Sequence, residues 1–329
     1  MRVAIVGAGA IGTLLGHGFC KSGHTVTLLD LPERVAQLRD AGALVIHRDT
    51  GNKSSAVPYL ITCEYSEAGT QDFVFLATKS HDLPAVAEGI AELTHAETTI
   101  ITLQNGIPWW YLQDLPHKFG DARLKCLDPE GVLDNYIDSS RILGCVAYPA
   151  AILNPDGSVS HVEGDRFPVG ELAGGELPRT RRAVQLFESA GFKSRIIGDI
   201  RSEIWLKAWG ALSINPISAL TRATMEDICS FEATRELIMQ MMSEAQHVAE
   251  SFGAHFRHTI EKRIEGAQAV GAHKTSMLQD VENRRRLELD GLMLAVMELA
   301  SIAGRDTPTI RNVYACAALL DNTLRTTLP

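Results

Sequence analysis

Short apolar runs alternate with stretches of helical spacing through about the first 200 residues of the chain. Runs of four to eight apolar, often β-branched residues are typical of buried strands, whereas apolar positions three and four apart indicate helices. The predicted strands are 3–6, 25–29, 73–77, 99–103, 142–146 and 194–197. The predicted helices between them begin after the first strand and continue to about residue 22, then cover 34–41, 83–93 and 179–190. This alternation predicts a mostly parallel sheet covered by helices on both faces.

Residues 147–170 follow another pattern, because the turn sequence Asn154-Pro155-Asp156-Gly157 separates two short β-type runs. Clustered Asn, Pro, Asp and Gly favour a tight turn. We therefore expect an antiparallel edge on the same sheet.

The strand pattern ends near residue 198, and helical periodicity takes over. The predicted helices there are 201–214, 224–252, 255–270, 281–303 and 312–324. We therefore predict an α/β fold in two domains: a doubly wound Rossmann domain over residues 1–198 and an all-α domain over residues 199–329.

Composition narrows the classes of function. No run approaches the roughly 20 apolar residues of a membrane span, and the apolar start at 3–6 is too short for a signal peptide, so we expect a cytoplasmic protein. The formal net charge of −9 argues against nucleic-acid and anionic-membrane partners. The six cysteines are scattered singly, which indicates free thiols rather than disulfides or a metal site.

The most specific motif is Gly7-Ala8-Gly9-Ala10-Ile11-Gly12, which follows a predicted strand and begins a helix. In a dinucleotide-binding loop the first glycine permits the tight turn, the second lets the backbone approach a pyrophosphate, and the third lets helix and strand pack closely. The free N–H groups of the helix N-terminus, at Ala10 and Ile11, would face that anion. A plain glycine-rich turn is the alternative, and the strand–helix–strand context favours the dinucleotide.

Asp30 ends the second predicted strand, eighteen residues after Gly12. A carboxylate there binds the ribose hydroxyls and repels the 2′-phosphate of NADP, which favours NAD(H). Arg34 could still reach a 2′-phosphate, so NADP(H) stays open, and a capping role for Asp30 before Pro32 is the structural alternative.

Two further strand ends carry polar residues. Lys79 follows the strand at 73–77, and Asn105 follows the strand at 99–103. Ligands of open α/β sheets bind at the carboxyl ends of strands. A solvated loop lysine and an Asn105-Gly106 turn are equally good explanations at this point.

Lys207 and Glu288 are charged residues on apolar helical faces of the second half. Lys207 is the only charged residue between Glu203 and Arg222, so it is expected to point inward. Burial disfavours the ammonium form, and such a lysine can act as a general acid. Glu288 would pair either with Arg284 or Arg285 one turn earlier or with Lys207. Ser276 fits a capping box with Gln279, at a helix N-terminus that also suits a carboxylate.

With these residues in view, the chain resembles the ketopantoate reductases (2-dehydropantoate 2-reductases) over nearly its whole length. Six motifs occur in the family's order: the glycine motif, Lys79-Ser80-His81, Leu103-Gln104-Asn105-Gly106, Trp205-Leu206-Lys207, Ile214-Asn215-Pro216, and Ser276-Met277-Leu278-Gln279-Asp280 before Glu288.

The resemblance implies a reductase in which NAD(P)H gives a hydride to the 2-keto carbon of a small 2-oxo acid and Lys207 protonates the oxygen. Glu288 would help to hold the lysine and the substrate, and Asn105 would lie beside nicotinamide and substrate. Asn215 and Ser276 would bind the polar ends of the substrate. Lys79 and, by a poorer alignment, Ala150 match cofactor contacts. The expected activity is reduction of 2-dehydropantoate to (R)-pantoate, a step of pantothenate and coenzyme A biosynthesis.

Two departures from the family's pattern keep alternatives open. Ala211 stands where the family carries a substrate-binding Asn one turn after the lysine, and Asp30 stands where it often carries an Arg for the NADP phosphate. An NAD-dependent D-2-hydroxyacid dehydrogenase of the D-mandelate type is therefore the second candidate, with Trp109, Trp110, Trp205 and Trp209 lining either a larger pocket or the core. A dinucleotide-sensing protein without catalysis is the third, and Lys207 with Glu288 argues against it. The pattern leaves open the 2-oxo acid, the direction of reaction and a homodimer.

Overall fold

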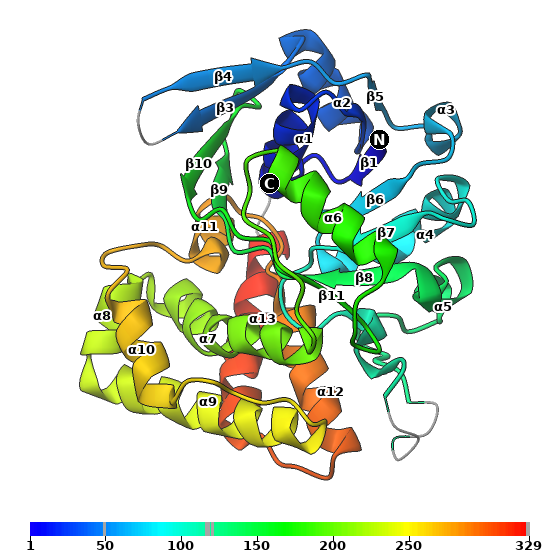
Figure 1. Ribbon diagram of the computed structural model, residues 1–329. Helices are drawn as coiled ribbons and strands as arrows, with labels where there is room; N and C mark the ends of the chain where they lie inside the picture. The colour runs from blue at the N-terminus through cyan, green and yellow to red at the C-terminus, as the bar shows by residue number, and fades with distance from the viewer. Residues whose placement is uncertain (49–50, 116–118, 120–121, 327–329) are drawn as a thin grey trace. The chain divides into compact units, whose positions relative to one another are not determined.

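The computed structural model describes residues 1–48, 51–115, 119 and 122–326, which by their contacts form two compact units (Figure 1). The first unit comprises Met1–Gln104 and Glu130–Ile200, and the second comprises Asn105–Pro129 and Arg201–Pro329. The second junction falls close to the predicted one at residue 198. The described residues of Asn105–Pro129 group by their contacts with the second unit, whereas the prediction placed them in a continuous first domain.

The main sheet of the first unit has, within the described residues, seven strands in the order β11-β8-β7-β6-β1-β2-β5. Its strands are β1 (Arg2–Val6), β2 (Thr25–Leu29), β5 (Leu60–Thr62), β6 (Phe73–Leu76), β7 (Thr99–Thr102), β8 (Ile142–Cys145) and β11 (Val169–Glu171). All neighbours pair in parallel except β11, which is antiparallel to β8. This confirms the predicted α/β fold with a Rossmann-like sheet.

The direction of winding changes between β1 and β6. From β1 the chain proceeds to β2 and β5 on one side and to β6, β7 and β8 on the other. In open α/β sheets the ligand crevice forms at such a switch point, beyond the carboxyl ends of the strands. Gly7, Asp30 and Lys79 all follow the carboxyl ends of parallel strands, so the topology brings them to the same edge of the sheet.

Helices α1 (Ala10–Lys21) and α6 (Pro178–Ser189) pack on one face of this sheet. Alternate strand residues such as Val3, Ile5 and Phe75 meet Phe19 of α1 and Phe187 of α6 in a fully buried cluster. The Phe75 and Phe187 rings are perpendicular, with centroids 5.6 Å apart. The remaining helical segments of the unit are α2 (Pro32–Ala41), α3 (Tyr65–Ala68), η1 (Ser80–Asp82), α4 (Leu83–Glu92), α5 (Val132–Tyr136) and η4 (Ser139–Arg141).

A second sheet lies against α1 and was not expected (Figure 1). Its strand order is β4-β3-β10-β9, with β3 (Leu44–Arg48), β4 (Lys53–Ala56), β9 (Ala150–Leu153) and β10 (Val159–Glu163). The prediction that 147–170 forms an edge of the main sheet is therefore correct for β11 and wrong for β9 and β10. The predicted strand at 194–197 makes only isolated bridges, such as Val169 to Ile196.

The regular elements of the second unit, within its described residues, are all helices. Its elements are η2 (Trp109–Leu112), α7 (Ile200–Thr221), α8 (Met225–Ser230), α9 (Glu232–Ser251), α10 (Ile260–Gln268), α11 (Ser276–Glu282), the π-helix η5 (Asp290–Leu294), α12 (Ala295–Ile302) and α13 (Pro308–Thr326). The predicted helix at 281–303 is wrong over 283–288, where the chain is not helical. No helix in the described chain combines the length and apolarity that crossing a membrane requires.

The tryptophans belong to the core of this unit. Trp110, Trp205 and Trp209 are fully buried, and Trp109 is 4% exposed. The Trp205 indole donates to the Tyr111 hydroxyl at 2.7 Å, and the Trp209 indole donates to the Met242 carbonyl at 2.6 Å. The indole N–H groups of Trp205 and Trp209 are thus satisfied inside the protein, whereas Trp109 Nε1 is buried with no hydrogen-bond partner among the described residues. Of the two roles that the sequence leaves open for the tryptophans, this burial favours the core.

His17 should make the stability of the first unit depend on pH. It lies on α1, 7% exposed, 3.0 Å from the Ser54 hydroxyl on β4, and burial together with Lys21 and Arg48 lowers its pKa to about 4. Between pH 6.5 and 4 the unfolded chain binds a proton here that the folded chain does not, so the free energy of unfolding falls as pH falls.

Urea unfolding at about pH 7.5 and pH 5 tests this. We expect the wild type to lose about 1–2 kcal/mol more than His17→Gln over that interval, since each pKa unit corresponds to about 1.4 kcal/mol and solvent screening reduces the effect. Equal losses in the two proteins would show that His17 does not titrate in this way.

Candidate active site

The glycine motif forms a sharply constrained loop between β1 and α1. Gly7 has φ +100°, and a Cβ added there would lie 2.6 Å from the Thr78 nitrogen. A Cβ on Gly12 would lie 1.9 Å from the Gly7 carbonyl oxygen. Both positions therefore require glycine, the first for its backbone angle and for close approach to β6, and the second for close approach of α1.

The same loop leaves space on its outer side, as a dinucleotide requires. A Cβ on Gly9 would meet nothing within 4 Å, and Gly9 is the N-cap of α1 and offers no side-chain cap to the first turn, where Ala10 and Ile11 lie partly exposed. Nearby strand ends carry Thr78 Oγ1 and Gln104 Oε1, which are buried and have no hydrogen-bond partner among the described residues. An open helix N-terminus beside unsatisfied polar atoms fits a bound pyrophosphate and nicotinamide.

Asp30 contacts the glycine loop directly. One carboxylate oxygen accepts the Ala8 N–H at 2.5 Å, and the other accepts the Leu31 N–H at 2.7 Å. Helix α2 begins at Pro32 with Leu31 as its N-cap, so Asp30 supports the loop rather than capping that helix. Its half-exposed side chain leaves acceptor capacity for ribose hydroxyls.

The other two predicted cofactor residues lie in different parts of the first unit. Lys79 is half-buried and directly precedes η1 at the end of β6. Ala150 is the first residue of β9 and pairs with Glu163 in the second sheet. Their predicted contacts remain predictions.

In the second unit three predicted residues form one hydrogen-bonded chain. The Lys207 ammonium on α7 donates to Asn105 Oδ1 at 2.5 Å, and Asn105 Nδ2 donates to Glu288 Oε2 at 3.2 Å. The sequence pattern pairs Glu288 with Lys207 or with an arginine one turn earlier, and it does not predict that Asn105 hydrogen-bonds to both Lys207 and Glu288. The Asn105 amide thus joins an ammonium and a carboxylate, and an ammonium held in this way can donate a proton to a substrate oxygen.

The backbone beside Asn105 is held against the π-helix η5. Gly106 has φ +84°, and a Cβ there would lie 2.3 Å from the Gly291 carbonyl oxygen. That same oxygen accepts the Ile107 N–H at 2.8 Å. A π-helix often marks a functional site, and here its segment orients Asn105 while placing Glu288 just before its start.

Two local expectations need correction. Glu288 was expected on a helical face with Gly291 and Leu292, but it lies in the non-helical segment that precedes Leu289. Ser276 was expected to cap its helix, but Thr275 is the cap and accepts the Leu278 N–H at 3.2 Å. Ser276 is the first helical residue and is exposed, so its side chain is available to solvent.

Helix α7 presents one open stripe in an otherwise buried surface. In the described stretch from Glu203 to Ala219 every residue is buried except Lys207, Ala211 and Asn215, which are partly exposed. Residues four apart lie on one face of a helix. Two predicted site residues and Ala211 therefore share a face.

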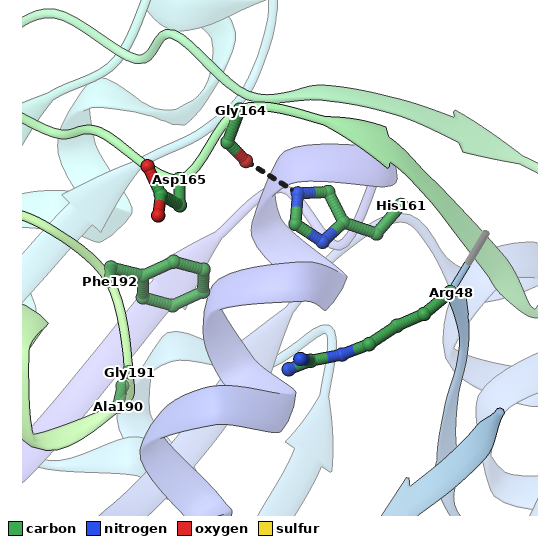
Figure 2. A pocket seen from close by; sticks show the side chains of 7 residues that line it. All are labelled: Arg48, His161, Gly164, Asp165, Ala190, Gly191 and Phe192. Carbon is green, nitrogen blue, oxygen red and sulfur yellow. Dashed lines mark hydrogen bonds between the residues drawn. The ribbon is translucent and has the colours of Figure 1, made fainter. Parts of the chain in front are cut away.

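A hollow of about 400 Å³ in the first unit contains none of the predicted site residues (Figure 2). Its lining is Arg48, His161, Gly164, Asp165, Ala190, Gly191 and Phe192. The His161 imidazole is held by the Gly164 carbonyl, with Nε2 and O 2.6 Å apart. We call the hydrogen-bonded group Lys207–Asn105–Glu288 the Lys–Asn–Glu chain.

Comparison with known proteins supports one family over nearly the whole sequence. The pattern of ketopantoate reductase PanE/ApbA matches residues 3–174, and that of its C-terminal part matches residues 199–321. A 2-dehydropantoate 2-reductase of Mesorhizobium japonicum is 41% identical over 315 residues, which covers 96% of each chain.

Solved structures agree with this. A protein of Ralstonia solanacearum MolK2 assigned as a ketopantoate reductase superposes with a TM-score of 0.92 at 33% identity, covering 98% of both chains. A D-mandelate dehydrogenase solved with NADH and anilino(oxo)acetate has a TM-score of 0.84 at 21% identity, covering 99% of this chain and 100% of that one, and shares the fold. The chain therefore belongs to the ketopantoate reductase family of oxidoreductases.

Proposed function

We propose that this protein reduces 2-dehydropantoate to (R)-pantoate with a nicotinamide dinucleotide. The observation that carries the proposal is the Lys–Asn–Glu chain, which gives a lysine proton donor a fixed direction. A relative of 41% identity over almost the full length that is named 2-dehydropantoate 2-reductase supports the choice of substrate.

Reduction of a keto group needs a hydride at carbon and a proton at oxygen. The bound dinucleotide would supply the hydride. Lys207 Nζ would hydrogen-bond the keto oxygen, stabilise the negative charge that develops there, and give up its proton as the alcohol forms. Asn105 Oδ1 keeps Nζ in one direction, and Glu288 fixes the Asn105 amide through Nδ2, so neither group needs to reorient during the reaction.

The residues of the first unit favour NAD(H) as the dinucleotide. Gly7, Gly9 and Gly12 would hold the pyrophosphate against the N-terminus of α1. Asp30 would accept ribose hydroxyls and repel a 2′-phosphate. Lys79 would lie on the cofactor side, as its motif suggests.

The polar ends of the substrate are assigned to two residues of the second unit. Asn215 shares the open stripe of α7 with Lys207, and Ser276 has an exposed hydroxyl at the start of α11. An amide and a hydroxyl can bind the hydroxyl and carboxylate groups of a 2-oxo acid of this kind.

A second candidate is reduction of a bulkier 2-oxo acid, as in D-2-hydroxyacid dehydrogenases. One observation favours it: Ala211 takes the position on the stripe between Lys207 and Asn215 where the family carries a substrate-binding amide. The absent amide leaves room and removes a hydrogen-bond donor, both of which suit an apolar substituent.

Lys207→Ala should lower kcat by about 10²–10⁴-fold, since proton donation and the stabilising charge vanish together. The dissociation constant for NADH should stay within about threefold, measured by fluorescence titration. Lys262→Ala, at an exposed lysine on α10, is the matched control and should leave kcat unchanged. Turnover of Lys207→Ala near the wild-type level would contradict the assigned role.

Ala211→Asn should shift the substrate preference toward 2-dehydropantoate. A new amide on the stripe can add one hydrogen bond, which is worth about 0.5–1.5 kcal/mol or roughly two- to tenfold in KM. We expect kcat/KM to rise by that factor for 2-dehydropantoate and to fall for phenylglyoxylate. Ala211→Val supplies bulk without the amide and should not lower that KM. An unchanged ratio of the two kcat/KM values in Ala211→Asn would show that residue 211 does not contact the substrate.

A further inference from the structure

Arg34 is tied into the first unit by hydrogen bonds from all three of its nitrogens. Nε donates to the Ala8 carbonyl at 2.9 Å, and Nη1 donates to Gln37 Oε1 at 2.6 Å. Nη2 donates to Thr13 Oγ1 and to the Gly157 carbonyl, each at 3.2 Å. A guanidinium with these four bonds is a fixed part of the fold, unlike a mobile surface arginine.

The Arg34 Nε bond is one of three side-chain hydrogen bonds to the peptide groups of Ala8, inside the glycine motif. The Ala8 N–H donates to Asp30, and the Ala8 carbonyl accepts from both Arg34 Nε and Thr13 Oγ1, the latter at 2.9 Å. Both faces of the residue between Gly7 and Gly9 are therefore held by charged side chains. Glycine-flanked peptides are otherwise free to rotate.

The opposite side of Arg34 rests on the second sheet. Besides the Arg34 bond to Gly157, Gln37 Nε2 donates to the Pro155 carbonyl at 3.0 Å. Gly157 has φ +85°, and a Cβ there would lie 2.8 Å from Gln37 Cδ and 2.9 Å from Arg34 Nη1. The turn between β9 and β10 thus fits closely around the Arg34–Gln37 pair.

We propose that Arg34 is a positioning residue for the Gly7–Gly12 loop. Arg34 is held in place by its bond to the β9–β10 turn. Together with Asp30 it fixes the loop backbone in the conformation that binds a dinucleotide. The inference rests on the proposed function. It assigns a role to the second sheet, and it removes Arg34 as a reader of the 2′-phosphate of NADP, because reading that phosphate would cost the bonds to Ala8, Thr13 and Gly157. A preset loop binds more tightly because no ordering cost is left for the binding step.

Two readings of Arg34 make opposite predictions for cofactor affinity. If Arg34 positions the loop, Arg34→Gln should raise the dissociation constants of NADH and NADPH alike, by about tenfold, with their ratio within about twofold of wild type. Arg34→Lys should not restore binding, since one ammonium cannot reproduce the fork to Ala8, Thr13 and Gly157. A rise confined to NADPH would show that Arg34 reads the phosphate and would overturn the proposal.

A substitution in the turn of the second sheet tests the connection between this turn and the glycine loop without replacing Arg34. It also keeps the proposal testable if the Arg34 variants do not fold. Gly157→Ala and Gly175→Ala introduce a side chain at φ +85° and +81°, so their backbone strain is matched. A Cβ on Gly175 meets nothing within 4 Å, whereas one on Gly157 presses on Arg34 and Gln37. We expect Tm to fall in both variants, further in Gly157→Ala because of the added side-chain contact, and dinucleotide binding to weaken several-fold in Gly157→Ala only.

The measurements are fluorescence titrations of NADH and NADPH, with Tm recorded for each protein without cofactor. Equal affinities of Gly157→Ala and Gly175→Ala would overturn the inference alone. A wild-type protein that binds neither dinucleotide would instead overturn the proposed function, so the two failures are distinguishable.

Discussion

The side-chain amide of Asn105 hydrogen-bonds an ammonium and a carboxylate at once, and neighbouring parts of the helical unit hold these groups in place. Its oxygen faces Lys207 and its nitrogen faces Glu288, so the amide can take only one orientation. Gly106 and the Gly291 carbonyl fix the backbone on one side. Helix α7, buried except along one stripe, fixes the lysine on the other.

In the first unit, hydrogen bonds with charged side chains likewise hold the backbone of the glycine loop in place. A loop that approaches an anion through its backbone must lack side chains, yet a chain without side chains is conformationally free. Here crowding at Gly7 and Gly12 narrows that freedom, and Asp30 and Arg34 bind the intervening peptide. The open position at Gly9 is left for a ligand.

The sequence predicts the parts of the fold whose signals are local. The strand–glycine–helix–strand unit was predicted because apolar runs and glycines lie within thirty residues. The second sheet was not, because β4 (Lys53–Ala56) is polar and short and pairs with strands a hundred residues away only through β3. The break at 283–288 was missed because this segment contains no glycine or proline to signal the end of a helix. The Ser276 cap was misplaced by one residue because Thr275 offers the same hydroxyl.

The site residues likewise divide into those that a local pattern identifies and those whose role depends on contacts distant in sequence. Lys207 and Glu288 are conspicuous as charges among apolar neighbours, so the pattern identifies them. The role of Asn105 between them depends on a contact across 102 and 183 residues, which no local pattern records. The sequence leaves two roles open for the tryptophans, since large aromatic side chains suit a pocket and a core equally well.

The most direct test of the account is the initial rate of NADH and NADPH oxidation with 2-dehydropantoate, measured beside phenylglyoxylate. The account predicts efficient reduction of 2-dehydropantoate, faster with NADH than with NADPH at equal low concentration. Reduction of phenylglyoxylate without turnover of 2-dehydropantoate by either dinucleotide would contradict it, and would place the protein among the D-2-hydroxyacid dehydrogenases.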